Sequence, residues 1–138
     1  MAAFVSLTIV GATAQDLKTS DVPAEVKSAC MKKFPESSKA KVAWEKEKGN
    51  YEANWGGKSG EDNSAMFTPA GEFIEFVKAI HVSKLPADAI KYVKENKKGA
   101  TISEAGLVTD AKGTVTYEAE VKGKDLIFDK DGKFLKVD

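Results

Sequence analysis

The sequence contains few of the residues that build covalent or catalytic centres. Cys30 is the only cysteine and His81 the only histidine in 138 residues. One cysteine excludes an internal disulfide and a zinc site of the multi-cysteine kind. A Ser-His-Asp triad would have to use His81, and no serine lies in a Gly-x-Ser-x-Gly motif. We therefore interpret His81 as a structural or partly exposed residue.

An excess of charge of either sign is also missing. Lys plus Arg total 21 and Asp plus Glu total 21, so the formal net charge is zero. A balanced chain produces no strong field to attract nucleic acid or an anionic membrane surface. We expect no nucleic-acid partner and no membrane insertion, and the choice of partner must depend on the local surface.

The N-terminal segment has the pattern of an export signal. Residues 1–14 read MAAFVSLTIVGATA, an uncharged apolar segment that ends in Ala12-Thr13-Ala14. This is typical of the hydrophobic region and cleavage site of a secretory signal peptide, and it is too short to span a bilayer. Because no Lys or Arg precedes Lys18, we expect the signal to be truncated at its start; a buried strand or helix is the alternative. The mature chain would begin near Gln15 and be periplasmic or secreted.

Three short segments occur twice in the same order. The pairs are 22–24 with 85–87, 51–53 with 117–119, and 65–74 with 126–135. Ordered matches at a nearly constant spacing indicate an internal duplication. We predict an α+β fold of two tandem repeats, 15–80 and 81–138, each with one helix packed on an antiparallel sheet of about four strands. A repeat of roughly 60 residues is marginally stable alone, so the two are expected to form one compact unit.

Each predicted repeat begins with an amphipathic helix. Val26 and Cys30 lie on the apolar face of a helix predicted over 22–34, and a second helix is predicted from Pro86 to Gly99. Alternating strands follow, and the last hairpin of each repeat would turn at Pro69-Ala70-Gly71 and at Asp131-Gly132. We interpret Cys30 as a small core residue, with pairing to another chain as the alternative.

Two acidic patterns suggest chemistry but have simpler explanations. Glu118 and Glu120 share one face of a predicted strand, at a spacing that two catalytic carboxylates could have. A raised pKa would require an apolar pocket, and we expect these glutamates on the solvent side of a half-buried sheet. The segment 129–132 resembles part of a calcium loop, but its glycine comes too early and no glutamate follows. We predict a hairpin turn there, and no enzyme activity, metal or cofactor.

Aromatic residues are the remaining candidates for a binding site. Tyr51 and Trp55 fall on the predicted core face of a strand. Trp44, Phe73 and Phe134 are predicted to contact a partner, because aromatic anchors on an open sheet face suit protein binding. The alternative for these three is a core between the repeats.

The order of these features resembles the PepSY-like family of bacterial envelope proteins, also described as β-lactamase-inhibitor-like. The shared features are an aliphatic-Pro-Ala segment before a helix, Trp44, Tyr-Glu-Ala, and Phe-x-x-x-Gly-x-Phe, given twice after a signal sequence. The resemblance implies a periplasmic or secreted protein with helices on an antiparallel sheet and no known catalytic centre. The sequence departs from the pattern where 96–99 replaces the aromatic-Pro that ends the first helix, and where Trp44 has no counterpart in the second repeat.

These observations together predict an exported, non-catalytic binding module. It would contact an envelope protein or peptide through its sheet face, mainly in the first repeat, which holds both tryptophans. Inhibition of an enzyme is one form that such binding could take. The alternative function is a small-ligand carrier with an apolar pocket between the repeats.

Overall fold

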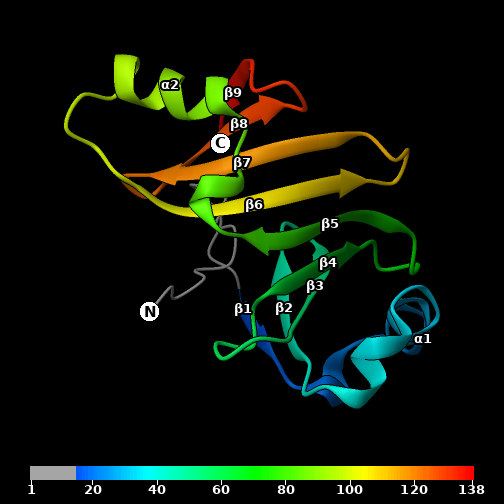
Figure 1. Cartoon of the computed structure of the whole chain (residues 1–138). Coiled ribbons are helices and arrows are strands. Elements are labelled where there is room, and N and C mark those ends of the chain that lie inside the picture. Colours follow the sequence, from blue (N-terminus) through cyan, green and yellow to red (C-terminus); the bar gives the residue numbers. More distant parts are fainter. Residues whose placement is uncertain (1–14) are drawn as a thin grey trace.

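The computed structural model describes residues 15–138, so the predicted signal peptide lies outside the described residues. They form one nine-stranded antiparallel sheet whose strands follow each other in chain order (Figure 1). The strands are β1 (Gln15–Leu17), β2 (Ala43–Glu47), β3 (Asn50–Trp55), β4 (Asn63–Phe67), β5 (Phe73–Ile80), β6 (Ile102–Asp110), β7 (Val115–Val121), β8 (Lys124–Asp129) and β9 (Phe134–Val137). The helices are α1 (Ala24–Lys33) and α2 (Ala87–Asn96), with short 3-10 helices η1 (Thr19–Asp21), η2 (Pro35–Lys39) and η3 (Val82–Lys84).

The predicted fold class, an α+β fold of two tandem repeats with a four-stranded sheet each, is wrong. β5 pairs with β6 over six residue pairs, from Glu75 opposite Asp110 to Ile80 opposite Ala105. This ladder joins all the strands into one sheet, so neither half has a sheet of its own. The physical reason is that an unpaired edge strand leaves its N–H and C=O groups without partners, and pairing β5 with β6 satisfies both edges. The division into 15–80 and 81–138 stays a prediction.

Both helices form where the apolar spacing predicts them, and each covers a separate core. Val26 and Cys30 of α1 are buried against Tyr51, Ala53 and Trp55 of β3. These contacts confirm the predicted core positions of Cys30, Tyr51 and Trp55. The second core gathers residues of α2 and the strands after it: Leu85, Ala89, Val93, Ala105, Ala119, Val121, Leu126 and Phe128.

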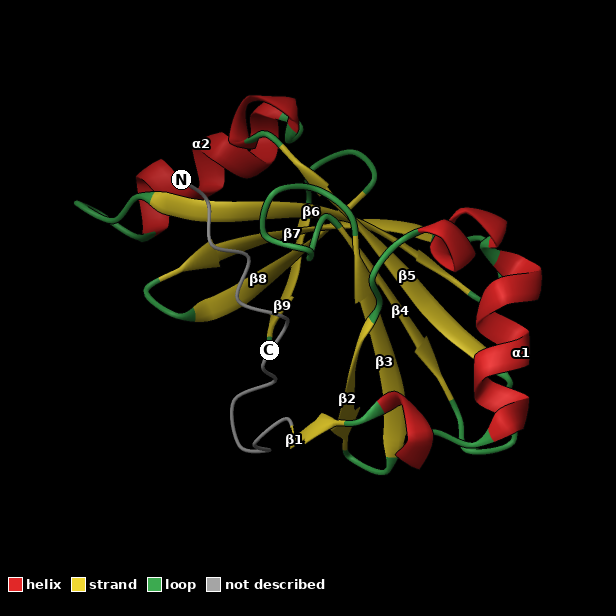
Figure 2. Cartoon of the chain, turned by 90° about the horizontal axis from the view of Figure 1, so that it is seen from below, coloured by secondary structure: helices red, strands yellow, loops and turns green. Residues whose placement is uncertain are grey.

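The two helices lie on the same face of the sheet. Phe76 of β5 packs against the core under α1, and Ile80 of the same strand packs against the core under α2. Side chains four residues apart on a strand point to the same face. Figure 2 shows the sheet curving, with α1 and α2 on the outer side of the curve. We call the opposite surface, which neither α1 nor α2 covers, the helix-free face.

Two hairpin turns are held close to the helices by glycine. Gly71, in the β4–β5 turn, has φ +85°, and a Cβ atom there would lie 2.8 Å from the backbone oxygen of Glu25 in α1. Gly132, in the β8–β9 turn, has φ +92°, and its Cβ would lie 2.9 Å from Pro86 Cβ, next to α2. Glycine is required at both positions because it adopts positive φ and has no side chain to collide with the helix. The predicted turns at these two sites are confirmed.

No helix among residues 15–138 is long and apolar enough to cross a membrane.

Candidate binding site

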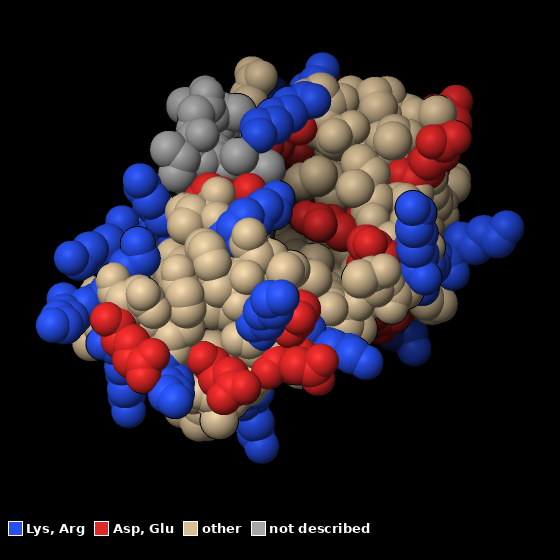
Figure 3. All heavy atoms as spheres, turned by 90° about the horizontal axis from the view of Figure 1, so that it is seen from above, with Lys and Arg blue, Asp and Glu red and all other residues tan. Residues whose placement is uncertain are grey.

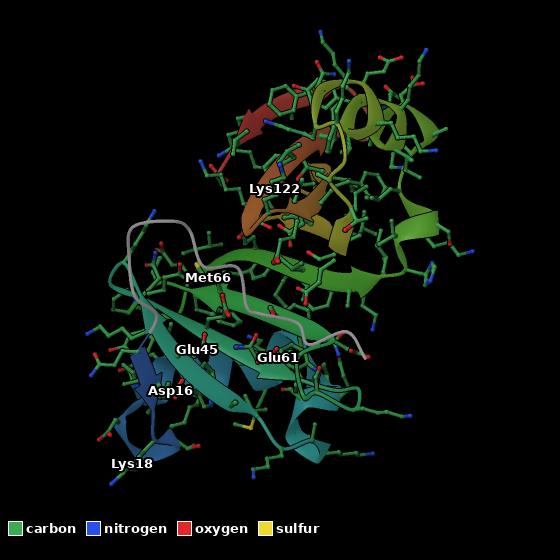
Figure 4. All side chains as sticks on the ribbon, turned by 90° about the vertical axis from the view of Figure 1, so that its left-hand side faces the viewer. Asp16, Lys18, Glu45, Glu61, Met66 and Lys122 are labelled. Carbon is green, nitrogen blue, oxygen red and sulfur yellow. The ribbon has the colours of Figure 1, made fainter. Side chains whose placement is uncertain are left out.

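Acidic side chains form a row across the helix-free face. Cross-strand pairing places Glu45 of β2 opposite Glu52 of β3, Glu52 opposite Met66 of β4, Met66 opposite Glu75 of β5, and Glu75 opposite Asp110 of β6. Figure 4 looks onto part of this face and labels Glu45 and Met66. Like charges directly opposite each other on neighbouring strands destabilise a sheet. The row therefore costs folding free energy, and such costs concentrate at functional sites.

Glu52 is buried within this row but has an internal hydrogen-bond partner. Its side chain is 3% exposed. Asn54 Nδ2 donates to Glu52 Oε1 at 3.1 Å, and Ser64 Oγ donates in turn to Asn54 Oδ1. Burial, followed by the negative charges of Glu45 and other carboxylates, raises the pKa of Glu52 to about 8, although the Asn54 hydrogen bond lowers it. Glu52 is thus held neutral at neutral pH by its surroundings.

Glu118 of β7 is also buried, and its environment differs from that of Glu52. The residue is 5% exposed, and its Oε2 atom has no hydrogen-bond partner among residues 15–138. It lies opposite Gly106 of β6, where a Cβ atom would be 2.8 Å from Glu118 Oε1. Burial, then the charges of Asp125 and Glu75, raise the pKa of Glu118 to about 9. The absence of a side chain at Gly106 gives the carboxyl group room to lie against the sheet.

Glu118 lines a cavity of about 360 Å³ on the helix-free face. We call it the carboxyl cavity; its lining residues are Glu75, Val108, Asp110, Thr114, Thr116, Glu118, Ile127, Leu135, Lys136 and Asp138. They come from β5, β6, β7, β8, β9 and the segments beside them. The cavity combines carboxyl groups with three aliphatic side chains. A concave surface that is partly apolar and carries a few polar groups is a typical ligand site.

Negative charge dominates the carboxyl cavity. Among the described residues that line it, four are acidic and Lys136 is the only lysine. Lys136 Nζ is paired with Asp138 Oδ1 at 3.0 Å. Burial, followed by the charges of Glu120 and Asp138, also raises the pKa of the neighbouring Asp125 to about 6. In Figure 3, Asp and Glu side chains lie in a recess of the surface and Lys side chains project around it.

The carboxyl cavity corrects one prediction from the sequence. Alternation places Glu118 and Glu120 together on one face of β7, as predicted, but Glu118 is buried and is not on a solvent side. The strand pattern shows which face a side chain takes, and it does not show what covers that face. A glycine inside a strand indicates a close approach to its backbone, so Gly106 was the available signal. In the part of the chain that is described, no group of three or more His, Cys, Asp or Glu is placed to hold a metal ion.

The three aromatic residues predicted to bind a partner are not brought together. Trp44 of β2 is 5% exposed and belongs to the core under α1. Phe73 of β5 packs beside the same core, with its ring centroid 6.0 Å from that of Phe34. Phe134 of β9 stacks on Tyr92 of α2 at 4.5 Å in the other core. All three pack on the helix side of the sheet, and their role in partner binding stays a prediction.

The other residues that stood out in the sequence have local structural roles. His81 is exposed, and its ring Nδ1 lies 2.7 Å from Ser83 Oγ beside η3. Asp129 accepts hydrogen bonds from the backbone N–H of Lys133 and Asp131, both at 2.9 Å. The Lys133 hydrogen bond is the main reason that the pKa of Asp129 is below its usual value. This arrangement confirms the predicted hairpin turn at 129–132.

A long antiparallel sheet with two helices on one face defines the class of fold, and comparison with solved structures finds it elsewhere. A protein of Bacteroides eggerthii assigned to the periplasm superimposes with a TM-score of 0.69 at 18% identity, over 85% of this chain and 88% of that one. A DUF2874 family protein of Bacteroides ovatus gives 0.67 at 21% identity, over 84% and 86%. A BLIP-like protein of Bacteroides fragilis gives 0.62 at 18% identity, over 84% and 85%. No family model matches the chain, and no curated protein matches it.

These similarities concern the fold. The BLIP-like neighbour agrees with the β-lactamase-inhibitor-like part of the predicted resemblance, whereas the PepSY-like part stays a prediction. The periplasmic assignment of the Bacteroides eggerthii protein supports the location predicted from the sequence.

Proposed function

We propose that this protein is an exported, non-catalytic binding module that contacts a protein or peptide through its helix-free face. The observation that carries the proposal is the carboxyl cavity, where Glu118 is buried among apolar and acidic side chains and its Oε2 has no hydrogen-bond partner within residues 15–138. A folded protein keeps such an arrangement at a cost in stability, since a buried polar group without a partner is unfavourable. A partner that supplies the missing interaction accounts for the cost.

The edge of this cavity also presents an apolar contact. Leu135 is 50% exposed, and it lines the carboxyl cavity beside Ile127. Exposed aliphatic groups at the rim of a polar recess are suited to a protein partner, which removes them from water on binding. This site differs from the predicted one, because it lies mainly on the strands after α2 and does not include Trp44.

The small-ligand alternative has a cavity of its own, although not between the two halves. A second space of about 360 Å³ lies beside α1, and Cys30, Met31, Val42 and Trp44 contribute to its lining. Its more apolar lining would suit a hydrophobic molecule. A fluorescent apolar dye tests this second candidate. The dye should bind wild type, a hydrophobic ligand should displace it, and Met31→Glu should bind the dye less tightly.

The two surfaces can be separated with a matched pair of variants. Leu135 on the helix-free face and Met31 on the helix side are both 50% exposed, so a charge at either position disturbs the fold to a similar, small extent. Immobilised wild type, Leu135→Glu and Met31→Glu would be incubated with periplasmic extract and their captured proteins compared. We expect Leu135→Glu to lose a captured protein that Met31→Glu retains. Capture that survives Leu135→Glu, or is lost only in Met31→Glu, would contradict the proposal.

A further inference from the structure

We propose that the carboxyl cavity receives a lysine or arginine side chain of the partner, with Glu118 as the buried counter-charge. This inference rests on the proposed function and names the chemistry of the partner at that site. It follows from four features of the cavity: an unpartnered acid, a surplus of negative charge, an aliphatic wall, and the missing side chain at Gly106.

The unpartnered acid is the first feature. Glu118 is 5% exposed and its Oε2 has no hydrogen-bond partner in the described chain. Glu52 is equally buried on the same face, but Asn54 donates a hydrogen bond to it. The fold therefore supplies a hydrogen-bond donor to Glu52 and leaves Glu118 Oε2 without one among residues 15–138. A donor from outside the chain would complete Glu118.

The charge of the cavity selects a cation. Glu75, Asp110 and Asp138 line it together with Glu118, and Lys136 is paired with Asp138. A positive group entering the cavity gains from Glu75, Asp110 and Asp138, and from Glu118 once that group has lost its proton. These interactions strengthen as water is excluded. An anion in the cavity would be repelled by the same carboxylates. Ammonium and guanidinium groups also carry N–H donors, which is what Glu118 lacks.

The aliphatic wall selects a side chain with a hydrocarbon stem. Val108, Ile127 and Leu135 line the same cavity as the carboxyl groups. Lysine and arginine bury their methylene groups along apolar surface while their charged ends reach polar groups. Gly106 gives the Glu118 carboxyl group room on the neighbouring strand, because a side chain there would collide with it. The cavity thus offers aliphatic contacts to the methylene groups of such a side chain and carboxyl groups to its charged end.

Binding of a cation is expected to depend on pH in a defined direction. Burial raises the pKa of Glu118 to about 9, so a cation that binds the carboxylate form must displace one proton into solvent. Affinity should therefore increase as pH rises from 6 towards 9. The charged groups that act on Glu118 or line the cavity with it are Glu52 of β3, Glu75 of β5, Asp110 of β6, Asp125 of β8, and Lys136 and Asp138 at β9.

The test uses a lysine peptide and a neutral analogue. Isothermal titration with the purified protein would compare acetyl-Gly-Lys-Gly-amide with the same peptide acetylated on the lysine Nζ. We expect the lysine peptide to bind wild type at least about tenfold more tightly, since a hydrogen bond to a charged group is stronger than one between neutral groups. Glu118→Gln should remove this difference, and Glu120→Gln, two residues along the same strand, should retain it. Lys136→Met should increase the affinity for the lysine peptide.

Several results would overturn the inference. Equal binding of the two peptides to wild type would do so without reference to any variant. An unchanged preference in Glu118→Gln would remove Glu118 from the site. Binding of Ca²⁺ alone, abolished in Glu118→Gln while the lysine peptide has no effect, would assign the cavity to a metal ion. If the two peptides bind equally but Leu135→Glu loses a captured protein, the proposed function stands without this inference. If the lysine peptide binds through Glu118 but capture survives Leu135→Glu, the proposed function is contradicted and only a cation site is left.

Discussion

Glu118 and Gly106 face each other across β7 and β6, and the glutamate carboxyl occupies space that a side chain on residue 106 would need. A Cβ atom on residue 106 would lie 2.8 Å from Glu118 Oε1 and 2.9 Å from Val77 Cγ1. Contacts of this length are well inside van der Waals separation. The buried acid of the carboxyl cavity is therefore positioned by the absence of a side chain on the neighbouring strand.

We predict that Gly106→Ala destabilises the protein through this contact. Overpacking a filled site costs about 1–3 kcal/mol, and the lower entropy of the unfolded alanine chain returns about 0.4–1 kcal/mol. The expected net loss is about 1–2 kcal/mol in the free energy of unfolding, measured with urea. In the double variant Gly106→Ala/Glu118→Ala the loss should shrink, because the colliding carboxyl is gone. Strict additivity of the two substitutions would contradict the contact.

We predict that stability decreases as pH rises. The pKa of Glu118 is about 9 in the folded protein and 4.5 ordinarily, so between these values the folded state binds more protons than the unfolded state. The free energy of unfolding must then fall with increasing pH over this range. Glu52, with a pKa of about 8, and Asp125, with a pKa of about 6, act in the same direction.

The measurement is urea unfolding at intervals from pH 5 to pH 9. Glu118→Gln cannot ionise, so its stability should depend less steeply on pH and should exceed that of wild type near pH 8. Glu120→Gln serves as the control on the same strand. A stability that rises with pH between 5 and 9, or a Glu118→Gln profile parallel to wild type, would show that Glu118 is not buried as an uncharged acid.

Local sequence signals predict the helices and the turns correctly. The spacing of Val26 and Cys30 defines the buried face of α1, and Asp131-Gly132 marks the β8–β9 turn. These features depend on residues a few positions apart, which the sequence presents directly. The helices and hairpins could therefore be derived without coordinates.

The sheet as a whole and the candidate site could not be derived in this way. The pairing of β5 with β6 joins strands on either side of α2, and no local pattern distinguishes one nine-stranded sheet from two smaller sheets. The burial of Glu118 depends on that pairing, because Glu75 and Asp110 reach its cavity from the joined strands. Alternation correctly places Glu118 and Ala119 on opposite faces of β7. Whether the face that carries Glu118 is buried depends on tertiary structure, which alternation does not show.

We predict that the Cys30 thiol is protected in the folded protein. It is buried, lies 3.7 Å from Ser37 Oγ, and has a pKa raised mainly by burial. The thiolate is the reactive form, so reaction with a disulfide reagent such as DTNB should be at least about a hundredfold slower in buffer than in denaturing urea. Cys30→Ala/Ser38→Cys, which moves the thiol to an exposed position, should react rapidly in both. Fast labelling of wild type in buffer would contradict the assigned burial.

We predict that Trp44 acts on binding through stability rather than through direct contact. It is 5% exposed in the core under α1, away from the carboxyl cavity. Trp44→Ala should cost about 3–5 kcal/mol in the free energy of unfolding, a large share of the 5–15 kcal/mol typical of a folded domain. Loss of a captured partner in that variant would therefore reflect a smaller folded fraction. Trp44→Phe keeps most of the buried volume, so its capture per folded molecule, with folding followed by circular dichroism, should match wild type. A fall in capture at unchanged stability would place Trp44 in the interface, as its sequence context first suggested, and would move the binding site towards the helix side of the sheet.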